Sequence, residues 1–310
     1  MTSKVTPCEK EQSTTKIESR VGPETKFFTN SKGKKIHCSY WRPNDNVAIR
    51  GLVFICHGFG EHLQWYEDLA LRLTATGLFA FGHDHIGHGR SEGVRGYVDS
   101  VDDYVGDLLQ HCDDVRAGHP DLPCFLVGHS MGGMIAIKSA MSRPRFFTGV
   151  VLMGPLIKVN ASEATPPRIF LARLVARILP TWPCPLVAKL KLDHVTRDEE
   201  MKNRMRKDPL RYQGGIRARW AVAGIEALMY FENHIPEVEW PFLILHGEED
   251  HLCAPEGSKM LLEHSKSTDK ELKIFPSAFH HLYLELPEVR HEALQDTVDW
   301  IAARVSTTKK

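Results

Sequence analysis

The segment CFLVGHSMGGMIAIKSAM, residues 124–141, places a serine between an apolar run and a run with helical spacing. Gly128 and Gly132 stand two residues to either side of Ser130, which allows a tight turn from a strand into a helix. Such a turn presents the serine hydroxyl above the end of a sheet, at the positive end of the helix dipole. A bare Gly-x-Ser-x-Gly is common, but one between an apolar strand and a helix is much rarer. We therefore predict that Ser130 is a catalytic nucleophile.

A serine hydroxyl needs a base, and the base needs a carboxylate to orient it. When a serine sits on this kind of turn, the acid and then the histidine follow it in the chain, each on a loop after a strand. The apolar run FLILHG leads directly into residues 248–250, Glu-Glu-Asp, and the run LKIF leads into the pair His280 and His281. Adjacent side chains point in different directions, so at most one histidine can face the serine. The order of the residues predicts the chemistry and leaves the choice within each group open.

Composition excludes several classes of protein. The 310-residue chain has 39 Lys and Arg and 39 Asp and Glu, so no net charge attracts nucleic acid. No apolar run reaches the roughly 18 residues of a membrane-spanning helix, and the polar N-terminus lacks the apolar core of a signal peptide. The seven cysteines are scattered without Cys-x-x-Cys spacing, which suits a reducing compartment. We therefore expect a cytoplasmic protein that does not bind nucleic acid.

The remaining pattern predicts the domain organisation. Residues 1–24 are expected to form a flexible tail, and residues 25–310 a single domain that opens with a hairpin over FFTNSKGKKIHCSYWRP. Apolar strand patterns then alternate with helical ones, one of which begins at Ser100 as its N-cap. Strands separated by helices predict a mainly parallel sheet with helices on both faces. The stretch at about 156–238 has helical patterns and no convincing strand, so we expect a helical cap over the C-terminal edge of the sheet.

The segment HDHIGHG offers an alternative chemistry, because His83, Asp84, His85 and His88 are all residue types that bind zinc. The two-residue period of a strand places His83 and His85 on one face and Asp84 on the other, and the glycines indicate a turn. Short motif matches have a high false-positive rate. We therefore interpret this segment as structural and predict neither a metal nor another cofactor.

Five motifs together are specific: HGFGEH (57–62), HDHIGHGRSEG (83–93), GHSMGG (128–133), GEEDHLC (247–253) and AFHHLYLELPEV (278–289). In their order and spacing the chain resembles the monoglyceride lipase family of α/β-hydrolases over nearly its whole length after residue 25. The resemblance implies an α/β-hydrolase fold in which Asp250 is the acid and His280 the base. His281 would then point away from the site or line its rim.

The resemblance also implies an oxyanion hole, a pair of backbone N–H groups that stabilise the negative charge of the reaction intermediate. One N–H is that of Met131, directly after the nucleophile, and the family assigns the other to the residue after His57-Gly58, which is Phe59. Glu61 and His62 match the family pattern and are interpreted as braces for this loop. In the family, the segment that begins at Asp84 is structural, with the carboxylate bonded to backbone groups of its turn.

The activity that the resemblance implies is hydrolysis of monoacylglycerols to fatty acid and glycerol through an acyl-enzyme. Two departures concern the head group: Tyr283 replaces a second histidine of the relatives, and Met205 stands where relatives place a tyrosine for the glycerol end. Three alternatives stay open from the residues. They are acyl transfer to another acceptor, lysophospholipase or carboxylesterase activity, and a catalytically silent fold that binds lipid.

Residues 166–180, PPRIFLARLVARILP, predict an amphipathic helix. Its apolar residues fill one half of the helical wheel, and Arg173 and Arg177 lie together on the flank; the apolar residues are Phe170, Leu171, Leu174, Val175, Ile178 and Leu179. A helix of this kind packs its apolar face on the rest of a cap, or lies in the headgroup region of a membrane. The family uses this region as a membrane-docking lid, so we expect peripheral membrane association. The oligomeric state is left open.

Overall fold

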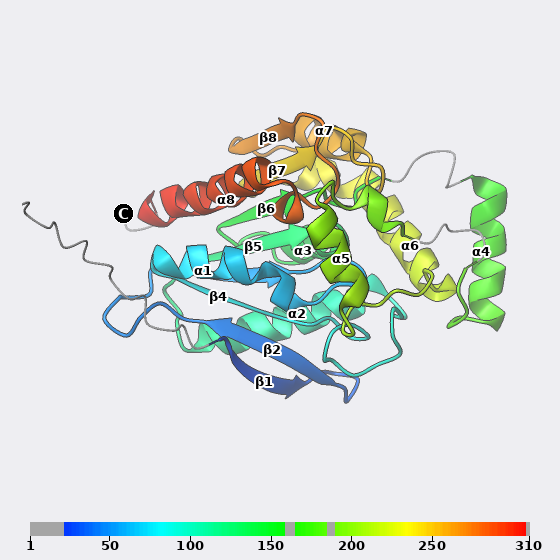
Figure 1. The fold of residues 1–310 in the computed structure, drawn as a ribbon, viewed down its shortest axis with the longest axis horizontal. Helices are drawn as coiled ribbons and strands as arrows, with labels where there is room; N and C mark the ends of the chain where they lie inside the picture. The colour runs from blue at the N-terminus through cyan, green and yellow to red at the C-terminus, as the bar shows by residue number, and fades with distance from the viewer. Residues whose placement is uncertain (1–21, 159–164, 185–189, 308–310) are drawn as a thin grey trace, which may run out of the picture.

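In the computed structural model the described residues are 22–158, 165–184 and 190–307. They form one eight-stranded sheet in the order β1-β2-β4-β3-β5-β6-β7-β8 (Figure 1). The first two strands pair antiparallel, β2 pairs antiparallel with β4, and the other neighbours are parallel. The strand bounds are β1 Glu24–Thr29, β2 Lys35–Trp41, β3 Gly51–Cys56, β4 Leu78–His83, β5 Cys124–His129, β6 Gly149–Met153, β7 Phe242–Gly247 and β8 Lys270–Phe275. The predicted α/β-hydrolase sheet and its N-terminal hairpin are confirmed.

Helices cover both faces of the sheet. One face packs on α1 (Glu67–Ala75) and α8 (Pro287–Thr307), and the other on α2 (Val101–Ala117), α3 (Met131–Ser142) and α7 (Pro255–His264). The strands β3 to β7 are buried along their whole length, which explains why their sequences are nearly continuous apolar runs. Short 3-10 turns lie at Leu63–Tyr66, Leu192–His194, Ile235–Glu237 and Leu282–Leu284. As predicted, Ser100 is the N-cap of α2, and its side chain accepts a hydrogen bond from Asp102 N in a capping box.

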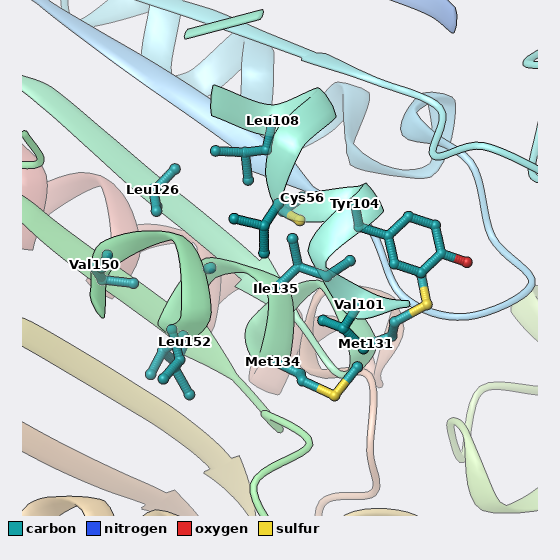
Figure 2. Close-up of a cluster of buried hydrophobic side chains, with 14 of the residues drawn as sticks. Cys56, Val101, Tyr104, Leu108, Leu126, Met131, Met134, Ile135, Val150 and Leu152 are labelled. Atoms are coloured by element: carbon teal, nitrogen blue, oxygen red, sulfur yellow. The ribbon is translucent and has the colours of Figure 1, made fainter. Parts of the chain in front are cut away.

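The core behind the nucleophile turn is closely packed. Figure 2 shows side chains of α2, α3 and the strands β3, β5 and β6 gathered into one apolar cluster. Ile135 of α3 and Leu108 of α2 are fully buried in it, as are Leu126 of β5 and Leu152 of β6. This packing holds the first turn of α3 against the sheet. Ser130, the residue directly before α3, therefore has a fixed position.

The cap follows β6. Its described residues contain α4 (Pro166–Ile178), α5 (Glu199–Lys207) and α6 (Ala218–His234), and an isolated β-bridge between Pro183 and Arg217 is the only strand pairing among them. Helix α4 lies at one end of the molecule, beyond α6 and away from the sheet (Figure 1). It packs on α6 through its small residues, Ala172 and Ala176. None of the described helices is both long enough and apolar enough to cross a bilayer.

Two boundaries of the predicted organisation fall at the margins of the described chain. Most of the predicted tail, residues 1–21, lies outside the described residues, and β1 begins at Glu24, the last position of that tail. The division into tail, domain and a cap at about 156–238 stays a prediction.

Candidate active site

Ser130 lies at the turn between β5 and α3, where the sequence predicts a nucleophile. Its backbone φ of 54° and ψ of −117° are strained for a residue with a side chain. Gly132 approaches the backbone carbonyl of Cys56 in β3 so closely that any Cβ there would clash with it. A Cβ at Gly128 would in turn meet the carbonyl of Gly132. The two glycines therefore allow the helix to start directly above the sheet, and the predicted strand-turn-helix is confirmed.

Backbone hydrogen bonds fix the position of this turn. Ser130 N donates to the Met153 carbonyl at the end of β6, at 3.1 Å, and Leu156 N donates to the Ser130 carbonyl at 3.0 Å. Ser130 is therefore tied both to the neighbouring strand and to the start of the cap. Such ties let the structure hold the strained backbone at this residue.

Asp250 lies on the loop after β7 and is almost completely buried. Its Oδ1 accepts hydrogen bonds from the backbone N–H groups of Leu252 (2.8 Å) and Cys253 (2.9 Å). Its Oδ2 lies 2.6 Å from His280 Nδ1 and 3.1 Å from His246 Nε2. Burial alone would raise the pKa of this carboxyl, but the two histidines outweigh burial and hold the pKa well below its usual value. Asp250 is therefore ionised and held in one orientation.

His280 lies on the loop after β8, where the sequence predicts the base. Its ring is buried, and its Nδ1 is occupied by Asp250. Burial lowers the pKa of His280, but the Asp250 carboxylate outweighs it, and the pKa lies above that of an ordinary histidine. With Nδ1–H donated to Asp250, Nε2 is the nitrogen that can accept a proton.

The structure brings the three predicted residues into one place, although 30 residues separate the acid from the histidine and 120 separate the serine from the acid. Ser130 Oγ lies 4.0 Å from the Sγ of Cys253, the residue whose N–H binds Asp250. The His129 ring, next to Ser130 in the chain, lies 4.7 Å from the His280 ring. The serine turn thus contacts the acid loop through Ser130 and the catalytic histidine through the neighbouring His129.

Sequence reasoning missed a second histidine on the acid. His246 Nε2 faces both Asp250 Oδ2, at 3.1 Å, and the Cys253 carbonyl, at 3.0 Å, while its Nδ1 lies 2.7 Å from Ser258 Oγ. The side chain is fully buried and packs between the acid loop and α7. The only signal in the sequence is a histidine near the end of the apolar run FLILHG, a place where a buried strand has little use for a polar side chain.

The loop HGFGEH after β3 carries the predicted second donor of the oxyanion hole, the backbone N–H of Phe59. His57 anchors the start of the loop: its Nε2 accepts a hydrogen bond from His85 N at 3.0 Å, so its Nδ1 carries the proton and donates to the Gly58 carbonyl at 2.8 Å. Gly58 N donates to Glu61 Oε2 at 3.0 Å. Each backbone group of Gly58 is thus fixed, which fixes the approach of the chain to Phe59.

The structure confirms that Glu61 and His62 brace this loop. Glu61 is buried, and its Oε2 accepts hydrogen bonds from Gly58 N and from the Tyr66 hydroxyl, the latter at 2.6 Å. His62 Nε2 lies 2.6 Å from Oδ2 of Asp208 in the cap. Glu61 therefore ties the end of the loop to its start at Gly58, and His62 ties the loop to the cap through Asp208.

Of the two alternatives for His281, the structure excludes a position on the rim of the site and leaves a side chain that points away from it. It is fully buried, with 0% of its surface exposed. Its ring packs 4.0 Å from the His129 ring and 5.6 Å from the Tyr66 ring, and its Nε2 lies 3.5 Å from Glu61 Oε1. Burial and the neighbouring His129 hold the pKa of His281 well below its ordinary value, so the ring is neutral. The motif identified the histidine beside the acid, but it carried no information about where its neighbour lies.

Glu61, His129 and His281 are the one group among the described residues whose ligand atoms lie close enough together to hold a metal ion. The Glu61 carboxylate, however, already accepts hydrogen bonds from Gly58 N and Tyr66, and the two imidazoles pack against each other. We therefore assign this cluster to hydrogen bonding and packing behind the site.

The segment HDHIGHG has the structural role that the resemblance implies. Asp84 accepts hydrogen bonds from the backbone N–H groups of Leu63 (2.8 Å) and Arg90 (2.8 Å), and so ties the turn to the loop after β3. The histidines have separate partners: His85 Nε2 lies 3.3 Å from Cys56 Sγ, and His83 Nδ1 lies 3.2 Å from Nδ1 of His111 in α2.

Comparisons with known proteins agree with this geometry. The model of the family described as "Serine aminopeptidase, S33" matches residues 47–287. The human monoglyceride lipase is 37% identical over 280 residues, covering 90% of this chain and 91% of the relative. The monoacylglycerol lipase of Mycolicibacterium smegmatis is 32% identical over 279 residues, covering 90% and 96%. Among solved structures, a soluble variant of the Saccharomyces cerevisiae monoglyceride lipase in complex with a substrate analog has a TM-score of 0.79 at 25% identity, covering 92% of this chain and 96% of that one.

The fold, the serine turn and the buried acid–histidine pair define a serine hydrolase of the α/β-hydrolase class. Within that class, the similarity along almost the entire length shows that the chain belongs to the monoglyceride lipase family.

Proposed function

We propose that this protein hydrolyses monoacylglycerols to free fatty acid and glycerol, with Ser130, His280 and Asp250 as its catalytic triad. The observation that carries the proposal is the pair formed by Asp250 and His280, 2.6 Å apart and buried beside a serine with strained backbone geometry. The relatives named monoglyceride lipase support the choice of substrate.

In the first half-reaction, Ser130 Oγ attacks the ester carbonyl while its proton moves to His280 Nε2. The imidazolium that forms is stabilised by the ionised Asp250. The glycerol oxygen then leaves with the proton from His280, and the fatty acyl group stays on Ser130. Water enters, gives its proton to the same nitrogen, and releases the fatty acid. One group serves as base and then as acid, which requires a pKa near the working pH.

The negative charge on the carbonyl oxygen develops next to the first turn of α3. The backbone N–H groups of Met131 and Phe59 are the proposed donors to it, and the loss of one such donor costs about 3–4 kcal/mol of barrier. The hydrogen bonds around Gly58 support this role, because they fix the loop before the substrate arrives. A preorganised donor stabilises the transition state without the cost of reorganisation.

We also propose that α4 attaches the enzyme to the surface of a membrane that contains its substrate. The apolar half of this helix, with Trp182 just after it, faces away from the protein; the exposed fractions are 72% for Phe170, 44% for Leu171, 47% for Leu174, 68% for Ile178, 49% for Leu179 and 61% for Trp182. The opposite, small-residue side packs on α6. Arg173 and Arg177 are exposed on the flank, where they can reach anionic headgroups. An apolar face of this size is an interaction surface.

Covalent labelling with a fluorophosphonate tests the catalytic proposal. We expect the wild-type protein to be labelled at Ser130 and to hydrolyse a monoacylglycerol, and Ser130→Ala to lose both properties while keeping its thermal unfolding midpoint. Ser142→Ala, an exposed serine on the same helix, is the matched control and should behave as wild type. An undiminished rate in Ser130→Ala at equal folded concentration contradicts the triad.

A further inference from the structure

A surface pocket of about 460 Å³ lies in the cap beside the proposed oxyanion loop. Its walls come from the turn at Leu192–His194, from the end of α5 and the loop that follows it, and from Phe59. The volume falls within the range of about 300–1,000 Å³ that is typical of small-molecule sites. The pocket therefore has one residue, Phe59, in common with the proposed oxyanion hole.

The pocket is cationic. Lys191, Arg206 and Arg211 line it together with a single carboxylate, Asp193, which leaves an excess of two positive charges. Asp193 is held at the edge, where its Oδ1 lies 3.6 Å from Arg206 and 3.8 Å from Lys202. The chain as a whole has no net charge, so this excess is local.

Arg211 is the exceptional residue of the pocket. It is partly buried, and its Nε has no hydrogen-bond partner among the described residues and no access to solvent. Two carboxylates are close enough to act on its charge, Glu61 and Asp208, but both are occupied. Glu61 binds Gly58 and Tyr66, and Asp208 binds His62 and Trp65.

The Nε–H group of Arg211 is therefore costly to the folded protein. The guanidinium stays protonated at all ordinary pH values, and a buried donor without a partner is unfavourable. Burial lowers the pKa of Arg211, and the nearby carboxylates offset this only in part. The planar fork of donors is suited to a bidentate contact with an oxyanion. An anionic ligand would supply the partner that the protein itself does not.

We propose that this pocket binds the phosphate of a phosphorylated alcohol half, so that the enzyme also hydrolyses monoacylglycerol phosphates. The inference rests on the proposed function and specifies its substrate class. A phosphate monoester carries a charge of about −1.5 to −2 at neutral pH, which matches the excess of two positive charges better than a carboxylate does. Phe59 links the pocket to the ester, because its backbone N–H is a proposed oxyanion donor and the same residue lines the pocket.

The test compares two soluble substrates with the same short acyl chain, a monoacylglycerol and the corresponding monoacylglycerol 3-phosphate, below the concentration at which either aggregates. Arg211→Met removes the charge and keeps much of the volume. We expect kcat/KM for the phosphate ester to fall at least about tenfold, the effect of one lost charged hydrogen bond, and kcat/KM for the neutral ester to stay within about threefold. Arg204→Met is the matched control, because Arg204 lies on α5 outside the pocket and over Trp65, and it should affect neither substrate.

A binding measurement separates this inference from the proposed function. Glycerol 3-phosphate should raise the thermal unfolding midpoint of Ser130→Ala, in which no ester is turned over, and should fail to do so once Arg211→Met is added. Equal losses on both esters would show that Arg211 is structural and would overturn the proposal. An unfolding midpoint of Ser130→Ala that does not change with glycerol 3-phosphate would also overturn the proposal. A change in binding to phosphatidic acid vesicles alone, with the soluble assays unaltered, would assign the charge to the membrane and overturn it as well. If the neutral ester is not a substrate of the wild type, the proposed function fails, and the binding result still stands.

Discussion

The acid of the core site and helix α4 of the cap differ in how far the protein buries and contacts their side chains. Asp250 is buried and contacted by two histidines and two backbone N–H groups. In the cap, α4 exposes the apolar half of its surface. A carboxylate that is contacted from several sides holds one geometry, as a reaction requires, whereas an exposed apolar face indicates a surface that is still to bind. The comparison separates the chemistry from the recognition.

The largest expected effect is the loss of the base in the core. His280→Ala removes the proton acceptor of Ser130, and because triad residues act as a unit the rate should fall by about 10⁴-fold or more. The measurement is kcat on a short soluble ester, at equal folded concentration judged by circular dichroism. His264→Ala, at the end of α7 and distant from the acid, is a suitable control. If the activity of His280→Ala stays within tenfold of wild type, His280 is not the base, and the catalytic role given to the core site is contradicted.

A smaller effect is expected from the cap, and only on one kind of substrate. Changing Leu174 and Leu179 together to Ser removes apolar surface that the protein leaves exposed, so the folded state loses little. Vesicle association and hydrolysis of vesicle-borne monoacylglycerol should weaken by roughly tenfold, because each leucine contributes a part of the 1.5–3 kcal/mol of full burial. Hydrolysis of a short soluble ester should not change. Phe27→Ser, an exposed apolar residue of β1, is the control and should have no effect on either assay. If both substrates slow equally, α4 acts on the fold and not on the membrane.

The smallest effect on the rate is expected at His281, even though it adjoins the base. Its buried ring packs on those of His129 and Tyr66, so His281→Ala should lower the free energy of unfolding by about 2–5 kcal/mol, the cost of the cavity that the lost ring leaves. His281→Gln, which keeps a donor and most of the volume, should recover much of it. Activity per folded molecule should stay within about tenfold for both variants.

The pH profile sharpens this contrast between the paired histidines. The rate should rise with pH as His280 loses its proton, and because the Asp250 carboxylate raises the pKa of His280, this limb lies above pH 6.5, the ordinary histidine value. His281 is already neutral there, since its own pKa is lowered, so His281→Gln should keep the limb in place. A limb that disappears in His281→Gln would make His281 the titrating group.

Local sequence was enough for the fold and for the nucleophile turn. Strands buried on both faces have continuous apolar runs, and the turn around Ser130 needs glycines at fixed positions, so both leave a signal in a short window. The choice of Asp250 over its acidic neighbours, and of His280 over His281, came from motif resemblance. The structure brings these residues together with Ser130, and their catalytic roles stay a prediction until the variants are measured.

Tertiary structure alone decided what surrounds those residues. His281 lies behind the site because the rings of Tyr66 and His129 pack around it there, and these partners are more than 150 residues away in the chain. His246 contacts Asp250 because it lies near the end of β7, directly before the loop that carries Asp250. The sequence indicated an apolar face on α4, but only the packing of Ala172 and Ala176 on α6 shows that this face points outward. Local patterns fix an element and its faces, whereas the identity of a partner depends on which distant segments the fold brings into contact.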